Sequence, residues 1–432
     1  MVCALVVPAF VLVALHLHDG DASATSSLLA VDGPHLPSSG ISTGGSSTSR
    51  IRSRNNNFVG EADCKAYGCP VYPGDVADET IQSQIGEVKD VFPHAGKLSL
   101  PFGSTRMAAC TQRGTTSQHN FNQDRGILIS PYYWKGDALL RQHGVSMDGE
   151  SFPSSTTDFF LGIFDGHGDE GHHISRYLQK DMAERLSDKL SQLPAEDIEG
   201  GSGVEQSLKE AFIESDKNVP EVHAINGGST AAVILRLGQK IYFANAGDST
   251  TFVASYSRRT GETKVVHRNR KDKPHLPEER ARIEASGGKV RAPPDHPIQA
   301  RVIAYNSVRK ELVGLAMSRS IGDWEHGKVG VIAEPTVDVL DVDDILRGNG
   351  GGGDEMEAFV VVGSDGLFDA RQPQFVANHL SKSFFGKEAD VTGLLDGDRD
   401  HPVVQCSKLI GIATPKDPAR YRDDITLLFL RL

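Results

Sequence analysis

The chain has 432 residues, of which 38% are hydrophobic, and its formal net charge at pH 7 is −12. This length allows one large domain or two small ones, and the hydrophobic share is typical of a soluble globular protein that builds its own core. The acidic excess argues against nucleic acid as the main partner, because phosphate backbones are bound by clustered Lys and Arg. It suits a protein that binds cations.

The chain begins with an apolar run at residues 2–17. A membrane span needs ~20 residues, so the core of a signal peptide explains the run better, with the small residues 22–24 as a cleavage site. No Lys or Arg precedes Arg50, although signal peptides usually have a basic start. An uncleaved anchor and an unused hydrophobic segment are the alternatives for residues 1–24, and we expect membrane contact only if this segment is uncleaved.

Residues 25–104 are predicted to be a low-complexity linker followed by an irregular lead-in. Ser, Gly and Thr dominate up to about residue 57, so the segment has too little apolar surface to offset the entropy of ordering it. Its Ser-rich, Arg-bearing end also resembles an organelle transit segment. The secretory pathway or a plastid is the favoured location and the cytoplasm is the alternative, although a flexible linker is the simpler interpretation of these residues.

The five cysteines are too few for a disulfide scaffold in a chain of this length. Cys64 and Cys69 are close enough in sequence to pair in an oxidising compartment. No second close pair is present, which argues against a structural zinc site. Free thiols are the favoured state of Cys3, Cys64, Cys69, Cys110 and Cys406.

From residue 105 onward the pattern indicates strands and helices. Apolar runs rich in Val, Ile, Phe, Tyr and Leu predict strands at 159–164, 231–237, 240–246, 359–362 and 425–430. Helical spacing of apolar residues, with Pro277 at one start, predicts helices at 174–193, 204–215, 277–286, 373–384 and 402–413. Residues 136–157 and 348–353 are predicted insertions. A hairpin between the second and third strands favours antiparallel sheets covered by helices over a doubly wound fold.

Aspartates stand at the ends of four of these strands. Carboxylates held by rigid strand ends can converge on one point, and Mg²⁺ and Mn²⁺ prefer such oxygen ligands. Two such ions ~3.5–4 Å apart can activate a water and clamp a phosphoryl group. Each Asp-Gly pair alone, as at 165–166 and 365–366, is more often an ordinary turn, so only the whole set indicates a metal site.

Short strings along the chain carry a resemblance to a known family. They are NQD at 122–124, FDGHG at 164–168, GGSTAAV at 227–233, FANAGDS at 243–249, LAMSRSIGD at 315–323, GVIAEP at 330–335, GSDGLFD at 363–369 and RDDIT at 422–426. On these strings residues 105–432 resemble the metal-dependent protein phosphatases, the type 2C serine/threonine phosphatases. The resemblance implies an α+β fold in which two antiparallel β-sheets form a sandwich flanked by pairs of α-helices, with a dinuclear metal site at one end.

The resemblance also implies which residues hold the metals. By position, Asp165 bridges two Mg²⁺ or Mn²⁺ ions, the carbonyl of Gly166 faces one of them, and Asp365 and Asp423 complete the two sites. Asp124 would act through a metal-bound water. A further pair, Asp248 and Asp369, matches positions that support a weaker third metal in some members.

The implied reaction is hydrolysis of phosphoserine or phosphothreonine in a protein substrate. A metal-bridging hydroxide would attack phosphorus in line, and His167 would protonate the leaving oxygen, since the pKa of an imidazole lies near working pH. We expect a monomer. A pseudophosphatase that only binds, and a phosphatase of a small phosphorylated metabolite, are the alternatives.

Several positions depart from the family pattern. His119 stands where many members have a phosphate-binding Arg, Gln123 replaces a Glu, and the string at 271–274 is KDKP instead of DHKP. The changes at His119 and Gln123 support the pseudophosphatase alternative, whereas the complete set of aspartates favours an active enzyme. Asp424 replaces the usual Asn; the extra carboxylate would either raise metal affinity or face water, and facing water is the favoured interpretation. Two other residues are given structural roles: Arg319 in an ion pair with an acidic neighbour, and Trp324 in the core or at the cleft rim.

Overall fold

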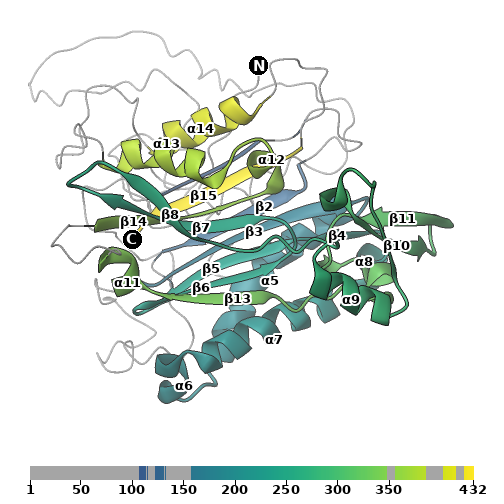
Figure 1. Cartoon of the computed structure of the whole chain (residues 1–432). Helices are drawn as coiled ribbons and strands as arrows, with labels where there is room; N and C mark the ends of the chain where they lie inside the picture. Colours follow the sequence, from purple (N-terminus) through teal and green to yellow (C-terminus); the bar gives the residue numbers. More distant parts are fainter. Residues whose placement is uncertain are drawn as a thin grey trace, which may run out of the picture.

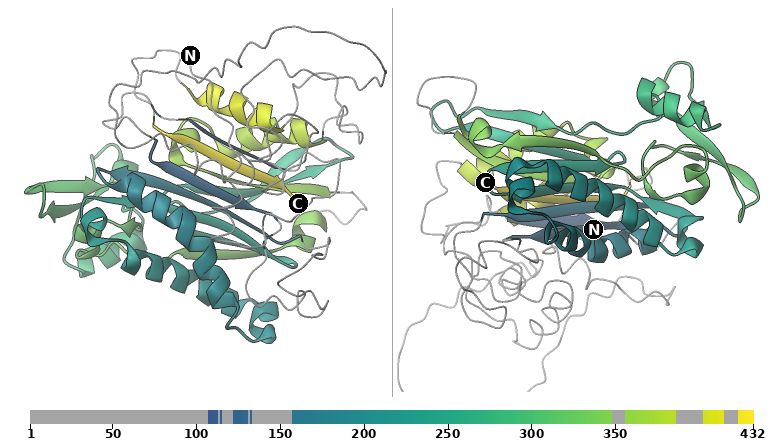
Figure 2. Two further views of the ribbon diagram at one scale, coloured as in Figure 1. Left: turned by 180° about the vertical axis from the view of Figure 1, so that it is seen from behind. Right: turned by 90° about the horizontal axis from the view of Figure 1, so that it is seen from below.

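The computed structural model describes residues 107–112, 114, 122–130, 132, 157–347, 356–385, 402–414 and 423–432. Two β-sheets pack face to face in these residues, and helices cover the outer face of each (Figures 1 and 2). The α+β fold, with a sandwich of two antiparallel sheets flanked by pairs of helices, is therefore confirmed.

Some predictions concern parts of the chain outside the described residues. These are the segment 1–24, the linker 25–104, positions 136–156 and 348–353 of the insertions, and His119. The secretory or plastid location depends on the first two segments and stays a prediction. Among the helices that the structure describes, none has both the length and the apolar character of a membrane span.

The first sheet has five antiparallel strands in the order β1-β15-β14-β7-β8. They are β1 (Met107–Gln112), β15 (Ile425–Arg431), β14 (Met356–Gly363), β7 (Thr250–Ser257) and β8 (Thr263–Arg268). Helices α13 (Pro373–Phe385) and α14 (Pro402–Ala413) cover its outer face (Figure 1). The short α12 (Asp365–Phe368) follows β14 directly.

The second sheet is antiparallel in the order β12-β4-β3-β5-β6-β13, with β2 also paired to β3. Its strands are β2 (Asp124–Ile129), β3 (Phe159–Gly168), β4 (Gly227–Ser229), β5 (Ala231–Leu237), β6 (Lys240–Ala246), β12 (Ile321–Gly322) and β13 (Thr336–Asp341). The helices α5 (Gly171–Leu190) and α7 (Ser202–Asn218) cover it, and α6 (Ala195–Gly200) and α8 (Glu221–Ala224) flank α7 in sequence.

A third, small sheet projects from one end of the sandwich (Figure 1). It consists of β9 (Lys289–Arg291), β10 (Arg301–Asn306) and β11 (Glu311–Leu315), and the 3₁₀ helix η2 (Pro297–Gln299) precedes β10. We call these three strands the small sheet. Helix α9 (Pro277–Ala285) leads into it, α10 (Trp324–Gly327) lies between β12 and β13, and α11 (Val342–Arg347) follows β13.

Burial on both faces explains why β3 is a continuous apolar run. Leu161 and Ile163 point into the core between the two sheets, where they join Val360 and Val362 of β14. Alternate residues such as Phe160 point to the other face and pack under α5 and α7. The two faces give the sandwich one core between the sheets and another beneath the helices.

All the predicted strands and helices are present. The strands are as long as predicted or longer, and β3 continues through the FDGHG string to Gly168. Helix α5 begins and ends three residues earlier than predicted. The predicted end was too late because Leu193, which lies beyond the helix, still packs against the core. Strands such as β8 were missed, since its residues alternate between half-buried and exposed without a clear apolar face.

Cys110 and Cys406 form a disulfide, so the prediction of free thiols is wrong for these two positions. Cys110 lies on β1, Cys406 lies on α14, and both are fully buried. They are 296 residues apart in sequence, so nothing local indicates the pairing. The bond ties α14 to the edge of the first sheet.

Removing this disulfide should lower the free energy of unfolding. Cross-links that close long loops typically contribute about 2–5 kcal/mol. Urea denaturation of the oxidised chain and of the Cys110→Ala/Cys406→Ala double variant measures the loss. Equal urea midpoints for the oxidised wild type and the double variant would contradict a stabilising role. Mass spectrometry after alkylation under denaturing conditions checks that the wild type holds the bond.

Candidate metal centre

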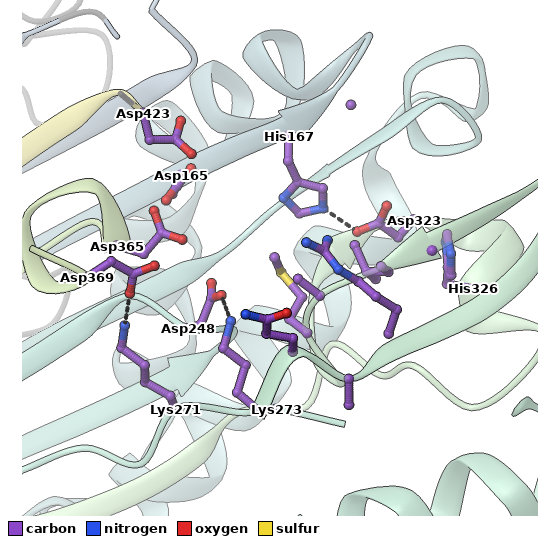
Figure 3. A pocket seen from close by; sticks show the side chains of 18 of the residues that line it. Asp165, His167, Asp248, Lys271, Lys273, Asp323, His326, Asp365, Asp369 and Asp423 are labelled. Atoms are coloured by element: carbon purple, nitrogen blue, oxygen red, sulfur yellow. Dashed lines mark hydrogen bonds and ion pairs between the residues drawn. The ribbon is translucent and has the colours of Figure 1, made fainter. Parts of the chain in front are cut away.

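Seven aspartates are among the residues that line one cleft, which has a volume of about 1480 Å³. Figure 3 shows five of them on one side, opposite His167 and a sixth, Asp323: Asp165, Asp248, Asp365, Asp369 and Asp423. The seventh is Asp424. The sequence analysis selected the five on one side. The structure therefore brings together side chains that lie as much as 258 positions apart in the chain, from Asp165 to Asp423.

The strand ends explain why these carboxylates converge. Asp165 lies near the end of β3, Asp365 begins α12 with one residue between it and the end of β14, and Asp423 stands just before β15. Gly363 at the end of β14 pairs with Leu427 near the start of β15, which places the two neighbouring aspartates at the same end of the sheet.

Asp124 lies beside this group, across the β2–β3 ladder from Asp165. The hydroxyl of Ser364 donates a hydrogen bond of 2.7 Å to its Oδ2, and Ser364 in turn accepts one of 2.9 Å from the backbone N–H of Thr426. Asp124 is thus held by the first residues of α12 and β15. It is behind the cleft wall and not among the residues that line the cleft.

Burial raises the pKa of both Asp165 and Asp365 well above the ordinary value, and the charges of the surrounding carboxylates raise it further. Burial, followed by the charge of Asp424, raises the pKa of Asp124 to about 7. So many neighbouring carboxylates can all be ionised only when positive charge compensates their repulsion.

The donor set fits divalent cations such as Mg²⁺ and Mn²⁺. Oδ1 of Asp124 and Oδ1 of Asp248 are buried and have no hydrogen-bond partner among the described residues. All the converging donors are oxygens, and hard cations select oxygen ligands. Asp165, Asp365 and Asp423 are therefore the residues that would hold such ions, with Asp124 supporting them.

Gly166 lies where no side chain fits. A Cβ at this position would be 2.5 Å from the carbonyl oxygen of Gly171 and 2.9 Å from that of Gln123. The preceding peptide is fixed as well, because Thr230 donates its N–H to the Asp165 carbonyl at 2.9 Å and accepts the Asp165 N–H on its hydroxyl at 3.1 Å. The backbone that carries the central aspartate is thus held in place on both sides.

His167 forms a buried pair with Asp323, which the sequence analysis did not select. Nε2 of His167 is 2.6 Å from Oδ2 of Asp323, which also accepts a 2.6 Å hydrogen bond from the hydroxyl of Ser320. Burial alone would lower the pKa of His167, but the charge and hydrogen bond of Asp323 raise it above the ordinary value. Gly228 makes room for the pair, since a Cβ there would lie 2.0 Å from Asp323 Oδ2.

Two lysines of the KDKP string face the aspartates that were matched to a third metal (Figure 3). Lys273 donates a hydrogen bond to Asp248, and Nζ of Lys271 lies 3.0 Å from Oδ1 of Asp369. Burial alone would raise the pKa of Asp248, but Lys273 lowers it below the ordinary value. Positive charge thus lies against both carboxylates, and a third metal would have to displace it.

Comparison with known proteins identifies the family. A family model described as protein phosphatase 2C matches residues 137–383, more than half of the chain. The chain belongs to the protein phosphatase 2C family. Asp124 and Asp423 lie outside the matched residues, but the structure places both beside Asp165, so the family's fold extends beyond the match.

The chain is similar to plant members of this family. It is 28% identical over 270 residues to probable protein phosphatase 2C 64 of Oryza sativa subsp. japonica, and the alignment covers 61% of this chain and 58% of the relative. It is 30% identical over 257 residues to probable protein phosphatase 2C 34 of Arabidopsis thaliana, and the alignment covers 56% of this chain and 68% of the relative. The chain thus spans about three fifths of the length of these relatives.

A solved structure shows the same fold. The serine-threonine phosphatase 2C from Toxoplasma gondii superposes with a TM-score of 0.54 at 16% sequence identity, covering 78% of this chain and 96% of that one. At this identity the likeness shows the fold of the family and nothing finer.

Asp424, where the family usually has Asn, does not face water as predicted. It is 7% exposed, and its carboxylate accepts the backbone N–H of Gly114 at 2.5 Å and that of Gln123 at 2.7 Å. The prediction was wrong because the backbone of Gly114 and that of Gln123, the residue before β2, both bond to this side chain. Both of its oxygens serve as backbone acceptors, which explains a carboxylate at this position.

The structural roles predicted for Arg319 and Trp324 are confirmed. Nη2 of Arg319 lies 2.8 Å from Oε1 of the fully buried Glu279, so the guanidinium pairs with an acidic neighbour. The partly buried Trp324 packs against the core and donates a 3.2 Å hydrogen bond from Nε1 to Asp216. Neither residue points to a role in the reaction.

Replacing Asp323 by Asn should lower the free energy of unfolding more at pH 6 than at pH 9. Asp323 raises the pKa of His167 in the folded protein, so its stabilisation is complete below the unfolded pKa of ~6.5 and is lost as the pH rises through the folded pKa. Urea denaturation at the two pH values measures the difference. The same substitution made in a His167→Gln background is the control and should lose the pH difference. An equal loss at both pH values in the wild-type background would contradict the pairing.

Proposed function

We propose that the chain is a metal-dependent phosphatase that hydrolyses phosphoserine and phosphothreonine in other proteins. The observation that carries the proposal is the convergence of Asp165, Asp365 and Asp423 in one cleft, facing the His167–Asp323 pair. Membership of the protein phosphatase 2C family supports the reaction class. Two divalent cations held there would supply the Lewis acidity that makes water a competent nucleophile and neutralises charge on the phosphoryl oxygens.

His167 supplies the acid. Its Nε2 is engaged by Asp323, while its Nδ1, on the other side of the ring, is buried and has no hydrogen-bond partner among the described residues (Figure 3). Asp323 raises the pKa of His167 and so favours the protonated imidazole, whose Nδ1 would give its proton to the leaving Ser or Thr oxygen. Asp323 acts through His167 as a positioning residue.

The size and rim of the cleft support a protein substrate. A volume of about 1480 Å³ exceeds the 300–1,000 Å³ that is usual for small-molecule sites. One side of the cleft is formed by the small sheet, with Arg301 and Leu315 among its lining residues. A phosphorylated side chain on an extended segment could enter between the small sheet and the aspartates.

Phosphate release from phosphothreonine and phosphoserine peptides tests the proposal. Turnover should require Mn²⁺ or Mg²⁺ and stop with a chelator. Asp165→Asn and Asp365→Asn should each lower turnover by more than about 100-fold, because losing a ligand costs more than losing its outer-shell partner. Asp344→Asn is the matched control, since Asp344 is exposed on α11 at the opposite end of β13 from the cleft.

Other results would point elsewhere. Folded protein that binds Mn²⁺ but releases no phosphate would favour a pseudophosphatase. Turnover of small phosphate esters without turnover of phosphopeptides would favour a metabolite phosphatase. Turnover that survives both aspartate substitutions would remove the cleft from the mechanism.

The lysine pairs make a further prediction about the third metal. Lys271→Ala should increase the number or affinity of Mn²⁺ ions bound, since it frees a carboxylate of Asp369 beside Asp365. Equilibrium dialysis with Mn²⁺ measures the change, and Lys209→Ala on α7 serves as the control. Unchanged binding in Lys271→Ala would show that this ion pair does not compete with a metal.

A further inference from the structure

A second group of ligand-type side chains lies outside the aspartate cleft. Glu170, His173 and His223 each present one donor atom, and the three atoms lie within 4.8 Å of one another. Oε2 of Glu170 is 2.8 Å from Nδ1 of His223 and 3.7 Å from Nε2 of His173. None of the three side chains lines the aspartate cleft.

Two separate segments of the fold bring these donors together. Glu170 is the residue before α5, and His173 lies in its first turn, where its N–H bonds to the Glu170 carbonyl at 3.1 Å. His223 comes from α8, 50 positions further along the chain. Its ring stacks on that of His173, with centroids 4.4 Å apart. The packing of α8 against α5 therefore sets the geometry before any ligand arrives.

The donor types differ from those of the aspartate cleft. Two imidazole nitrogens and one carboxylate oxygen suit a borderline ion such as Zn²⁺, whereas an all-oxygen group suits Mg²⁺ or Mn²⁺. Zn²⁺ binds such atoms at ~2.0–2.2 Å in a tetrahedron, which requires donor separations of roughly 3.3–3.5 Å. The separations of 2.8 and 3.7 Å from Glu170 lie on either side of this value, and the stacked rings of His173 and His223 would rotate to direct one nitrogen each at the ion.

Access from solvent is open. The side chains of His173, Glu170 and His223 are 40%, 31% and 26% exposed. We propose that these three residues form a second metal site, which takes one Zn²⁺ ion and leaves its fourth position to water. The proposal is independent of the phosphatase reaction, because it uses none of the cleft residues.

The position of the site gives it a structural consequence. The chain continues from His223 directly into Ile225 and Gly227, which face other elements. The Ile225 carbonyl accepts a 3.1 Å hydrogen bond from Asn306 of the small sheet, and the Gly227 carbonyl accepts a 2.9 Å bond from the N–H of Asp323. An ion that ties α8 to α5 would therefore fix the cleft wall that carries the partner of His167 and the edge of the small sheet.

Zinc titration in the presence of excess Mg²⁺ tests the proposal, since Mg²⁺ would compete with Zn²⁺ for the oxygen-only cleft and not for imidazole ligands. One Zn²⁺ per chain should bind and raise the melting temperature, and Co²⁺ in its place should give the visible absorption spectrum of a four-coordinate ion. His173→Gln and His223→Gln keep an amide that can hydrogen-bond to Glu170 but remove the imidazole ligand. Each should weaken Zn²⁺ binding at least ~10-fold and abolish the cobalt spectrum.

His296→Ala is the matched control, because His296 is exposed and lies outside the group. It should bind Zn²⁺ like the wild type. Asp165→Asn should also keep this zinc, which separates the site from the cleft. The proposal fails if the wild type binds no zinc under excess Mg²⁺, or if both glutamine variants, shown to be folded by their melting curves, bind it as the wild type does.

Discussion

Repulsion among buried carboxylates is the constraint on which the rest of this structure depends. Asp165 is surrounded by Asp124, Asp248, Asp365 and Asp423, and each of their charges makes its own ionisation harder. A flexible chain would relieve this by moving the groups apart. Here the ends of paired strands prevent it, and small polar groups such as Ser364 and Thr230 hold the surrounding backbone and side chains. The sandwich therefore keeps a concentrated negative charge that divalent cations can neutralise.

Basic side chains lie at two places around these carboxylates. His167 is held by Asp323 across the cleft, while Lys271 and Lys273 lie against Asp369 and Asp248 (Figure 3). The lysines stand in the string where this chain departs from its family. The departure thus falls on the candidate third metal position, at Asp248 and Asp369. Lysine charge at that position favours the two cations that we propose over a third.

Local patterns in the sequence were sufficient for the most apolar strands, the longer helices and the aspartates at strand ends. The run at 159–164 could be recognised because β3 is buried on both faces, and the aspartates because they follow such runs. The disulfide of Cys110 and Cys406 could not, since 296 residues separate its ends. The environment of Asp424 depends on the chain near Gly114, which closes over it from far away in sequence.

The sequence also did not show which side chains contact the predicted site residues, because those contacts join distant segments. Asp323 ends one of the strings that carried the family resemblance, yet only the fold shows that it meets His167. The sequence analysis did not select His173 or His223, and only the packing of α8 on α5 brings their rings together. The sequence therefore predicted the aspartates that gather in the cleft better than the residues that hold them and His167 in place.

Anomalous diffraction from crystals soaked in Mn²⁺ tests the central claim most directly, because it locates ions without relying on turnover. The account predicts two peaks ~3.5–4 Å apart, both in contact with Asp165, with Asp365 and Asp423 completing their ligands. Peaks at the cleft that avoid Asp165, or manganese bound only outside the cleft, would contradict it.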